Sequence, residues 1–179
     1  MGAIRNSPSV KLIIAFIFQD TKIFEAAQRI LVKRFGPLDF ESERISFTYT
    51  DYYEAEMGSN LQRVFISFKK LIDPSRMASI KTATNAIERK FSRNNKRAIN
   101  IDPGYLTLAK LVLASTKDFA HRIYLSHGIF AETTLIFKDK SFRPLEWTYP
   151  DFKTEPYLRI LENIRQLYHE QIRSVSIIS

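Results

Sequence analysis

A short acidic and aromatic stretch contains the residues best suited to bind a small ligand. Residues 50–58 read Thr-Asp-Tyr-Tyr-Glu-Ala-Glu-Met-Gly, in which Asp51, Tyr52, Tyr53 and Glu56 combine carboxylates with phenol rings. The rings could stack on a base or a sugar while the carboxylates bind hydroxyl or amine groups. The structural alternative is that the tyrosines pack this loop against the core, and the sequence leaves both interpretations open.

A second set of polar residues lies further along the chain. It consists of Asp102, Tyr105, His121, Arg122 and Glu132. Carboxylates together with an imidazole could perform acid–base chemistry or hold a divalent metal ion. Their spacing imposes no ligand geometry, so we predict no metal site. Asp102 precedes a proline and is predicted to cap a helix, and Glu132 is predicted to pair with Arg122 across a hairpin.

A run of basic residues lies between these two sets. It consists of Arg89, Lys90, Arg93, Lys96 and Arg97. Cations at the end of a helix complement the helix dipole, and they could equally form a patch that contacts phosphates. The whole chain is basic, with a formal net charge of +8, which favours an anionic partner such as a nucleotide or RNA.

Missing motifs exclude several common reaction classes. The chain of 179 residues has no cysteine, which removes thiol catalysis, cysteine-bound zinc and disulfides and fits a reducing cytoplasm. None of its five glycines precedes a lysine, so no P-loop is present, and no Gly-x-Ser-x-Gly turn exposes a serine nucleophile. The longest apolar run near the N-terminus, Leu12 to Phe18, is too short for a membrane span. We therefore expect a cytoplasmic protein with no membrane partner.

The hydrophobic pattern predicts an α+β fold with a ferredoxin-like βαββαβ unit and a mainly antiparallel sheet. The first strand, Val10 to Phe18, is apolar throughout, as in a strand buried on both faces. The elements that follow are a helix over 21–35, strands over 40–49 and 61–71, a helix over 74–92 and a strand over 98–101. Both helices should cover the same face of the sheet.

The C-terminal part is predicted to extend this unit with a β-hairpin and a terminal helix. The expected elements are a short helix over 104–115, a hairpin over 120–137 with a three-residue loop at 126–128, an irregular segment over 142–152 and a helix after residue 154. In this hairpin Ile123 pairs with Ala131, and an apolar face results. Residues 1–9 are expected to form a flexible tail and residues 10–173 a single α+β domain.

Four strings of the sequence resemble a known family. They are Thr50-Asp51-Tyr52-Tyr53, Asn100-Ile101-Asp102-Pro103-Gly104-Tyr105-Leu106, His121-Arg122-Ile123-Tyr124-Leu125 and Trp147-Thr148-Tyr149-Pro150-Asp151. At these separations they resemble the uncharacterised bacterial domain-of-unknown-function family 4416, over most of the chain. The resemblance implies a small stand-alone bacterial protein with no established activity. Members are sometimes labelled GTP-binding, although the P-loop motif is missing here.

Three hypotheses about function follow. The first is a binding module for a nucleotide-like or other anionic ligand, or for RNA, with Tyr52, Tyr53 and Tyr105 near the ligand. The second is a small enzyme that acts on a phosphorylated substrate through an Asp/His/Glu cluster. The third is an oligomeric interaction protein without a small ligand. The sequence identifies neither a cofactor nor an oligomeric state, and convergence of the polar residues in one pocket would favour a small-ligand site.

Overall fold

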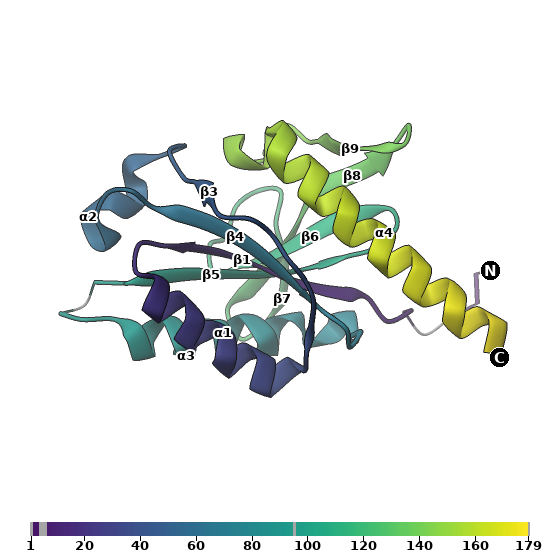
Figure 1. Cartoon of the computed structure of the whole chain (residues 1–179). Coiled ribbons are helices and arrows are strands. Elements are labelled where there is room, and N and C mark those ends of the chain that lie inside the picture. Colours follow the sequence, from purple (N-terminus) through teal and green to yellow (C-terminus); the bar gives the residue numbers. More distant parts are fainter. Residues whose placement is uncertain (1, 4–6, 95, 179) are drawn as a thin grey trace.

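The chain forms an α+β fold in which helices cover both faces of an antiparallel sheet (Figure 1). The structure is a computed structural model that describes residues 2–3, 7–94 and 96–178, without the side chains of residues 51 and 175–178. The strands within these ranges are β1 Lys11–Phe18, β2 Leu38–Glu41, β3 Ile45–Ser46, β4 Gln62–Phe68, β5 Ile99–Leu106, β6 Lys110–Ser115, β7 Ile123–Ser126, β8 Ile129–Lys138 and β9 Ser141–Pro144. The α-helices there are α1 Thr21–Phe35, α2 Glu54–Met57, α3 Met77–Phe91 and α4 Glu155–Ile178.

The apolar run near the N-terminus becomes a central strand. All eight residues of β1 are buried, and the strand pairs antiparallel with β4 on one side and β5 on the other. The full strand order is β2-β4-β1-β5-β6-β8-β7, with β3 pairing β4 and β9 pairing β8. A strand covered on both faces needs apolar side chains in both directions, which explains the uninterrupted run. The predicted central position of this strand is confirmed.

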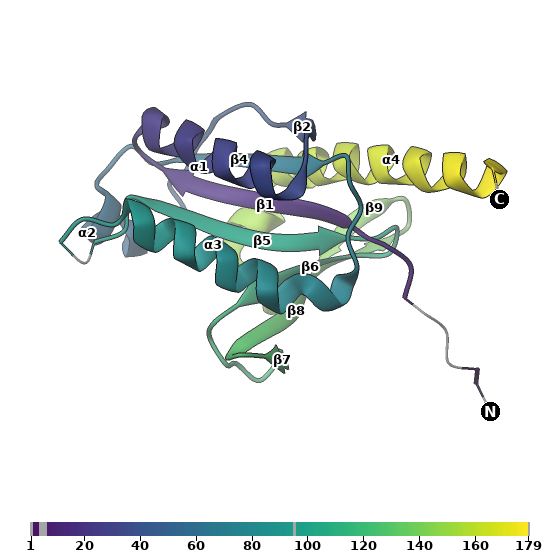
Figure 2. The same cartoon turned by 90° about the horizontal axis from the view of Figure 1, so that it is seen from below.

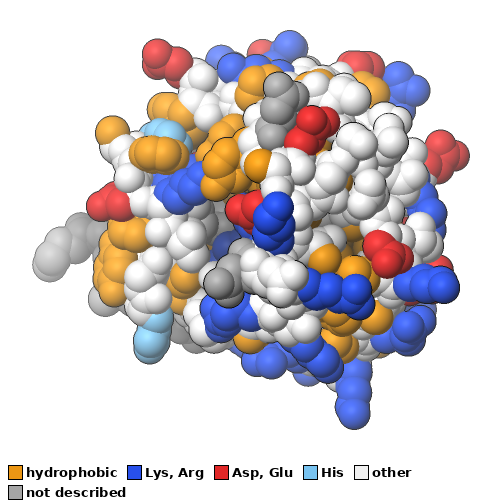
Figure 3. Space-filling model, turned by 90° about the vertical axis from the view of Figure 1, so that its left-hand side faces the viewer, with side chains coloured by type: hydrophobic (Ala, Val, Ile, Leu, Met, Phe, Trp, Pro, Cys, Tyr) orange, Lys and Arg blue, Asp and Glu red, His pale blue; other side chains and the backbone are white. Residues whose placement is uncertain are grey.

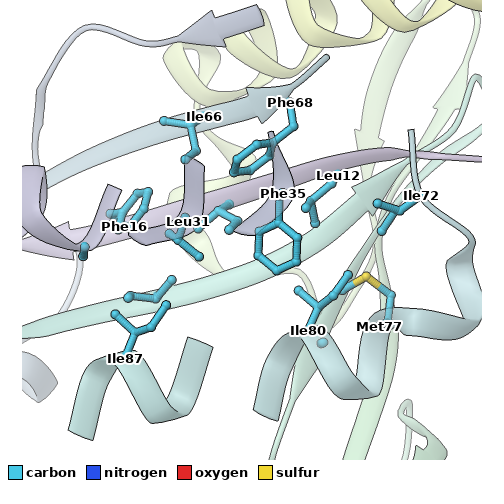
Figure 4. Packing of buried hydrophobic residues seen from close by; sticks show 14 of the residues in the cluster. Leu12, Phe16, Leu31, Phe35, Ile66, Phe68, Ile72, Met77, Ile80 and Ile87 are labelled. Carbon is cyan, nitrogen blue, oxygen red and sulfur yellow. The ribbon is translucent and has the colours of Figure 1, made fainter. Parts of the chain in front are cut away.

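Two helices pack on one face of the sheet and one on the other. Figures 1 and 2 show α1 and α3 side by side on one face and α4 on the opposite face. In Figure 4, Leu31 of α1 and Ile80 of α3 point toward the strands, where they join one apolar cluster with Phe16. Across the sheet, Tyr157 and Leu161 of α4 pack in a second cluster with Ile13, Phe65 and Phe142. The two helices predicted to share a face therefore do so.

The segment that follows Asp102 corrects the sequence interpretation. The predicted helix over 104–115 is wrong, and so is the helix-capping role of Asp102, because β5 and β6 form a hairpin there. Leu106, Leu111 and Leu113 are buried in the cluster beneath α4, and this alternation of buried side chains suits strands. Asp102 instead lies inside β5, opposite Ala15 of β1.

The pairing between β5 and β6 is short. Gly104–Leu106 pair with Leu111–Leu113, whereas β5 pairs with β1 and β6 pairs with β8 over their whole lengths. The pairing stops next to Pro103, which has no backbone N–H to donate to a neighbouring strand. Beyond this point the two strands separate, and the sheet opens between β5 and β6.

The hairpin of β7 and β8 differs from prediction at its loop. Ser126 pairs with Ile129, so the loop contains two residues rather than three, and both His127 and Gly128 have positive φ angles as a tight hairpin turn requires. A register shift between Tyr124 and Ser126 then restores the predicted pairing of Ile123 with Ala131. The expected apolar face is not all buried, because Ile123 is 73% exposed on this edge strand.

Two other segments also differ from the predicted pattern. The strand expected over 40–49 is divided into β2 and β3, and the segment over 142–152 contains β9 and a short 3-10 helix, Pro150–Lys153. The predicted flexible tail, residues 1–9, falls partly on residues that lie outside the described ranges. No helix in the described ranges is both long enough and apolar enough to cross a membrane.

The substitution Gly104→Ala is expected to lower the free energy of unfolding by about 1–3 kcal/mol. A Cβ at this position would lie 2.5 Å from the Val112 carbonyl oxygen and 2.7 Å from Leu113 Cδ2, so the paired strands would have to move apart. Urea denaturation followed by circular dichroism measures the change. Lys110→Ala, at an exposed position of β6, is the control, with an expected change below about 0.5 kcal/mol. Equal stability of the two variants would contradict the close approach of β5 and β6.

Candidate functional site

A cavity of about 760 Å³ lies at the end of the molecule where β5 and β6 separate. Figure 3 views the molecule from this end, with basic and acidic side chains gathered around a recess. Its walls come from α3, β5, β6, the segment after β3 and the 3-10 helix before α4. Its volume falls within the range of about 300–1,000 Å³ found for small-molecule sites.

Arg63 of β4 lies at the bottom of the cavity and is 3% exposed. Its Nη2 donates to Asp151 Oδ2 at 2.7 Å, and its Nε donates to the Tyr157 hydroxyl at 3.2 Å. The guanidinium carbon also lies 5.0 Å from the centre of the Phe47 ring and 5.7 Å from that of Phe152. Aromatic faces favour a cation at such distances, so the rings help to hold this buried charge.

The third nitrogen of this guanidinium has no hydrogen-bond partner among the described residues. Nη1 of Arg63 is buried and makes no hydrogen bond within the part of the chain that the structure describes. An unpaired buried donor is unfavourable, and a charged one more so. The nitrogen belongs to a residue that lines the cavity, so an acceptor in the cavity could complete its hydrogen bonding.

Two carboxyl groups in the cavity wall have opposite pKa shifts. Burial would raise the pKa of Asp102, but the nearby charges of Lys81 and Arg63 outweigh it and hold the pKa below its ordinary value. Asp102 accepts from Lys81 Nζ at 3.2 Å and from Asn100 Nδ2 at 2.6 Å. Burial raises the pKa of Glu88 to about 7, and its Oε1 accepts from the Ile101 amide at 2.6 Å. Asp102 is therefore an anion at neutral pH, whereas Glu88 can gain or lose a proton there.

A polar stripe on α3 positions Glu88 and its neighbours. Four residues of this helix line the cavity, Lys81, Asn85, Glu88 and Arg89, and the first three are spaced by four and three residues, as on one side of a helix. The helix was expected over 74–92, but Lys81, Asn85 and Glu88 were not among the predicted site residues. The sequence signal for this polar stripe was the helical spacing of its residues. They lie next to positions that are buried, such as Thr84 and Ile87.

The pair Arg122 and Glu132 forms another wall of the cavity. Arg122 Nε donates to Glu132 Oε2 at 2.6 Å, which confirms the predicted partnership across the hairpin. The same guanidinium donates to Ser115 Oγ at 2.8 Å and to the Tyr149 hydroxyl at 3.1 Å. Both charges are buried, and these contacts fix Arg122 at the point where β6 ends.

His121 lies beside this wall rather than in it. Its Nε2 is 3.3 Å from Glu132 Oε2, and its ring is stacked on Trp147 with 5.2 Å between ring centres and an interplanar angle of 8°. Tyr105 packs against the apolar cluster between the sheet and α1 and α3. Neither residue lines the cavity.

The predicted site residues thus divide into two groups. Those that line the cavity are Tyr52, Tyr53, Arg89, Arg97, Asp102, Arg122 and Glu132. Those that do not line it are Glu56, Lys90, Arg93, Lys96, Tyr105 and His121. The side chain of Asp51 lies outside the described part of the chain. Residues from both the acidic-aromatic stretch and the later polar set therefore meet at one cavity, although they are far apart in sequence.

The acidic-aromatic stretch is held in place by the basic run. Arg97 Nε donates to Glu56 Oε2 at 2.6 Å, and the Arg97 guanidinium carbon lies 5.5 Å from the centre of the Tyr53 ring. Burial raises the pKa of Tyr53, so its phenol stays protonated at neutral pH. Tyr52 by contrast is 57% exposed at the cavity mouth. One tyrosine of the pair therefore packs inward and the other faces solvent.

The arrangement provides anion and ring contacts more readily than metal ligands. No group of three or more His, Asp or Glu side chains that could hold a metal ion occurs in the described ranges. The described residues that line the cavity include six Lys and Arg and four Asp and Glu, a formal excess of two positive charges. They also include tyrosine rings at the mouth, which present flat surfaces to a ligand.

Comparisons with known proteins identify a family whose function is unknown. The family model described as "Domain of unknown function (DUF4416)" matches residues 8–168, which is most of the chain. No curated protein and no solved structure matches the sequence.

Proposed function

The chain belongs to the DUF4416 family, and from the geometry of its cavity we propose that it binds a small anionic ligand of nucleotide type. The observation that carries the proposal is Nη1 of the cavity-lining Arg63, a buried nitrogen that has no hydrogen-bond partner in the described part of the chain. A phosphate oxygen there would accept from this nitrogen in a charge-assisted hydrogen bond, which is stronger than a neutral one. The buried guanidinium is already oriented by Asp151 and Tyr157, so little ordering is required on binding.

The mouth of the cavity supports the aromatic part of this proposal. Tyr49, Tyr52 and Tyr149 line the cavity and are between 38% and 57% exposed. Their rings can stack on a base, and the carboxylate of Asp102 can accept from ligand hydroxyls. The same cavity supports the enzyme hypothesis only through Glu88, whose pKa of about 7 suits proton transfer at neutral pH.

We also propose a finer description of the fold. The order β5-β1-β4-β2, antiparallel throughout and with α1 and α3 on one face, supports a ferredoxin-like unit that β6 to β9 and α4 extend. Residues 10–173 would then act as one domain. A cytoplasmic location remains our proposal on the basis of the cysteine-free sequence.

Titration calorimetry with nucleotides tests the proposed function. We expect the four nucleoside monophosphates to bind and guanosine, which lacks the phosphate, to bind at least about 10-fold more weakly than GMP. Arg63→Lys retains the charge but removes Nη1, so GMP affinity should fall by about 10–100-fold. Arg29→Lys makes the same chemical change on the exposed surface of α1 and should leave the affinity unchanged.

Absence of phosphate binding would overturn the proposal. Thermal unfolding must first show that each variant is folded. If the folded wild-type protein binds neither the monophosphates nor inorganic phosphate at 10 mM, a concentration of about ten times a weak millimolar Kd, the cavity is not a phosphate site.

A further inference from the structure

Three rings lie beside the cavity wall, two of them exposed and one partly buried. Phe119 is 49% exposed and Trp147 is 39% exposed, and the His121 ring lies between them. The ring centres of Phe119 and His121 are 6.0 Å apart. Those of His121 and Trp147 are 5.2 Å apart, and the planes of these two rings are nearly parallel. We define these three residues as the aromatic row. Exposed rings in such a group are unfavourable in water unless a partner covers them.

The aromatic row adjoins the cavity without belonging to it. The three residues do not line the cavity, but the Arg122 guanidinium carbon lies 4.6 Å from the centre of the Phe119 ring, and His121 contacts Glu132. Arg122 and Glu132 both line the cavity. A ligand that filled only the cavity would therefore leave the row uncovered, whereas a longer ligand could pass from one to the other.

One exposed basic group accompanies the rings at the mouth. Lys117 is exposed, and its Nζ lies 4.8 Å from the centre of the exposed Tyr52 ring. The Arg122 guanidinium over Phe119 is buried and already donates to Glu132, Ser115 and Tyr149. Alternation of flat rings with cations is the chemistry that binds single-stranded nucleic acid, because every base has a stacking face and every nucleotide carries a phosphate. The net charge of +8 also favours binding of a nucleic acid, because its phosphates are negatively charged. A base-paired strand would not offer its base faces to the row.

We infer that the ligand of this site is the phosphorylated end of a single-stranded nucleic acid, with its terminal phosphate at Arg63 and its following bases on the aromatic row. This inference rests on the proposed function, since it uses the same cavity for the terminal nucleotide. RNA and DNA share the required phosphate and bases, and separate ligands in the experiment distinguish them.

Binding of short oligonucleotides tests the inference. The probes are UMP and hexauridylate with a 5′-phosphate, a 3′-phosphate or no terminal phosphate, together with the corresponding deoxyuridine hexamers. We expect a terminally phosphorylated hexamer to bind at least about 10-fold tighter than UMP, because stacking of one base contributes about 1–3 kcal/mol. The hexamer without a terminal phosphate should bind at least about 10-fold more weakly than its phosphorylated form.

Substitutions in the aromatic row distinguish binding of the terminal nucleotide in the cavity from binding of the following bases on the row. Phe119→Ala and Trp147→Ala should each weaken hexamer binding by about 10-fold and leave the affinity for UMP unchanged. Tyr124→Ala removes a ring that is 59% exposed on the edge strand and should change neither affinity. Trp147 is the single tryptophan of the sequence, so its fluorescence should be quenched by the hexamer and much less by UMP.

The binding results decide whether the inference, the proposed function or both fail. If UMP binds but no hexamer binds more tightly, the row is not part of the site and the inference fails while the proposed function stands. If neither UMP nor any hexamer binds, both fail. If the row variants dissociate an oligomer in light scattering and leave hexamer affinity unchanged, the rings serve self-association, which also overturns the inference.

Discussion

Replacement of Arg63 by methionine is expected to lower the free energy of unfolding by about 3–5 kcal/mol, the magnitude seen when one partner of a buried ion pair is removed. The variant leaves the Asp151 carboxylate, whose side chain is 8% exposed, without the guanidinium 2.7 Å away. It also leaves the Tyr157 hydroxyl without its donor. Urea denaturation at pH 7 measures the loss.

A second substitution shows whether the unpaired carboxylate causes the loss. The double variant Arg63→Met, Asp151→Asn should be less destabilised than the sum of the single variants, because it removes both charges of the pair. Arg29→Met on the exposed surface of α1 is the control, with an expected change within about 0.5 kcal/mol. A loss below about 1 kcal/mol for Arg63→Met would mean that this pair contributes little to stability.

The second large effect is a dependence of stability on pH that arises from Glu88. Its pKa is about 7 in the folded protein, against an ordinary value of 4.5, because burial disfavours the charged form. Between these two values the folded chain binds a proton that the unfolded chain has lost. The free energy of unfolding therefore falls as the pH rises through this window, by about 3 kcal/mol for the whole shift.

Glu88→Gln isolates this contribution. Glutamine still offers an oxygen to the Ile101 amide but does not titrate, so the variant should gain stability relative to wild type as the pH rises from 5 to 8. Glu25→Gln, at an exposed position of α1, is the matched control and should show no such trend. A stability difference between Glu88→Gln and wild type that stays constant from pH 5 to 8 would rule out the shifted pKa. Asp102, whose pKa is lowered, acts only at more acidic pH, where its protonation removes stability.

The long periodic segments were predictable from sequence, and the hairpin of β5 and β6 was not. Continuous burial specifies β1, and apolar residues at helical spacing specify α1, α3 and α4. The pair Asp102-Pro103 matches the start of a helix by type alone, yet here it lies within a strand that pairs with β1 along its full length. Contacts with a distant strand decided between two local conformations, and the local pattern does not contain them.

The candidate site was predictable in its walls and not in its base. Carboxylates and tyrosines near predicted strand ends identified Tyr52, Asp102 and Glu132, which the fold brings to one cavity. Arg63 gave no such signal, because it occurs within an apolar strand and looks like a solvent-facing position. Its burial depends on Asp151, which is 88 residues away in the chain. Only a contact map of the folded protein connects them.

The two hydrogen-bond partners of Arg63 determine when the cavity is completed during protein synthesis. Asp151 and Tyr157 belong to the 3-10 helix before α4 and to α4 itself, whereas most other walls of the cavity come from earlier elements. A nascent chain that has not yet released these residues from the ribosome holds an Arg63 without its two anchoring groups. The proposed ligand site is therefore complete only late in translation, after the contacts of Arg63 with Asp151 and Tyr157 have formed.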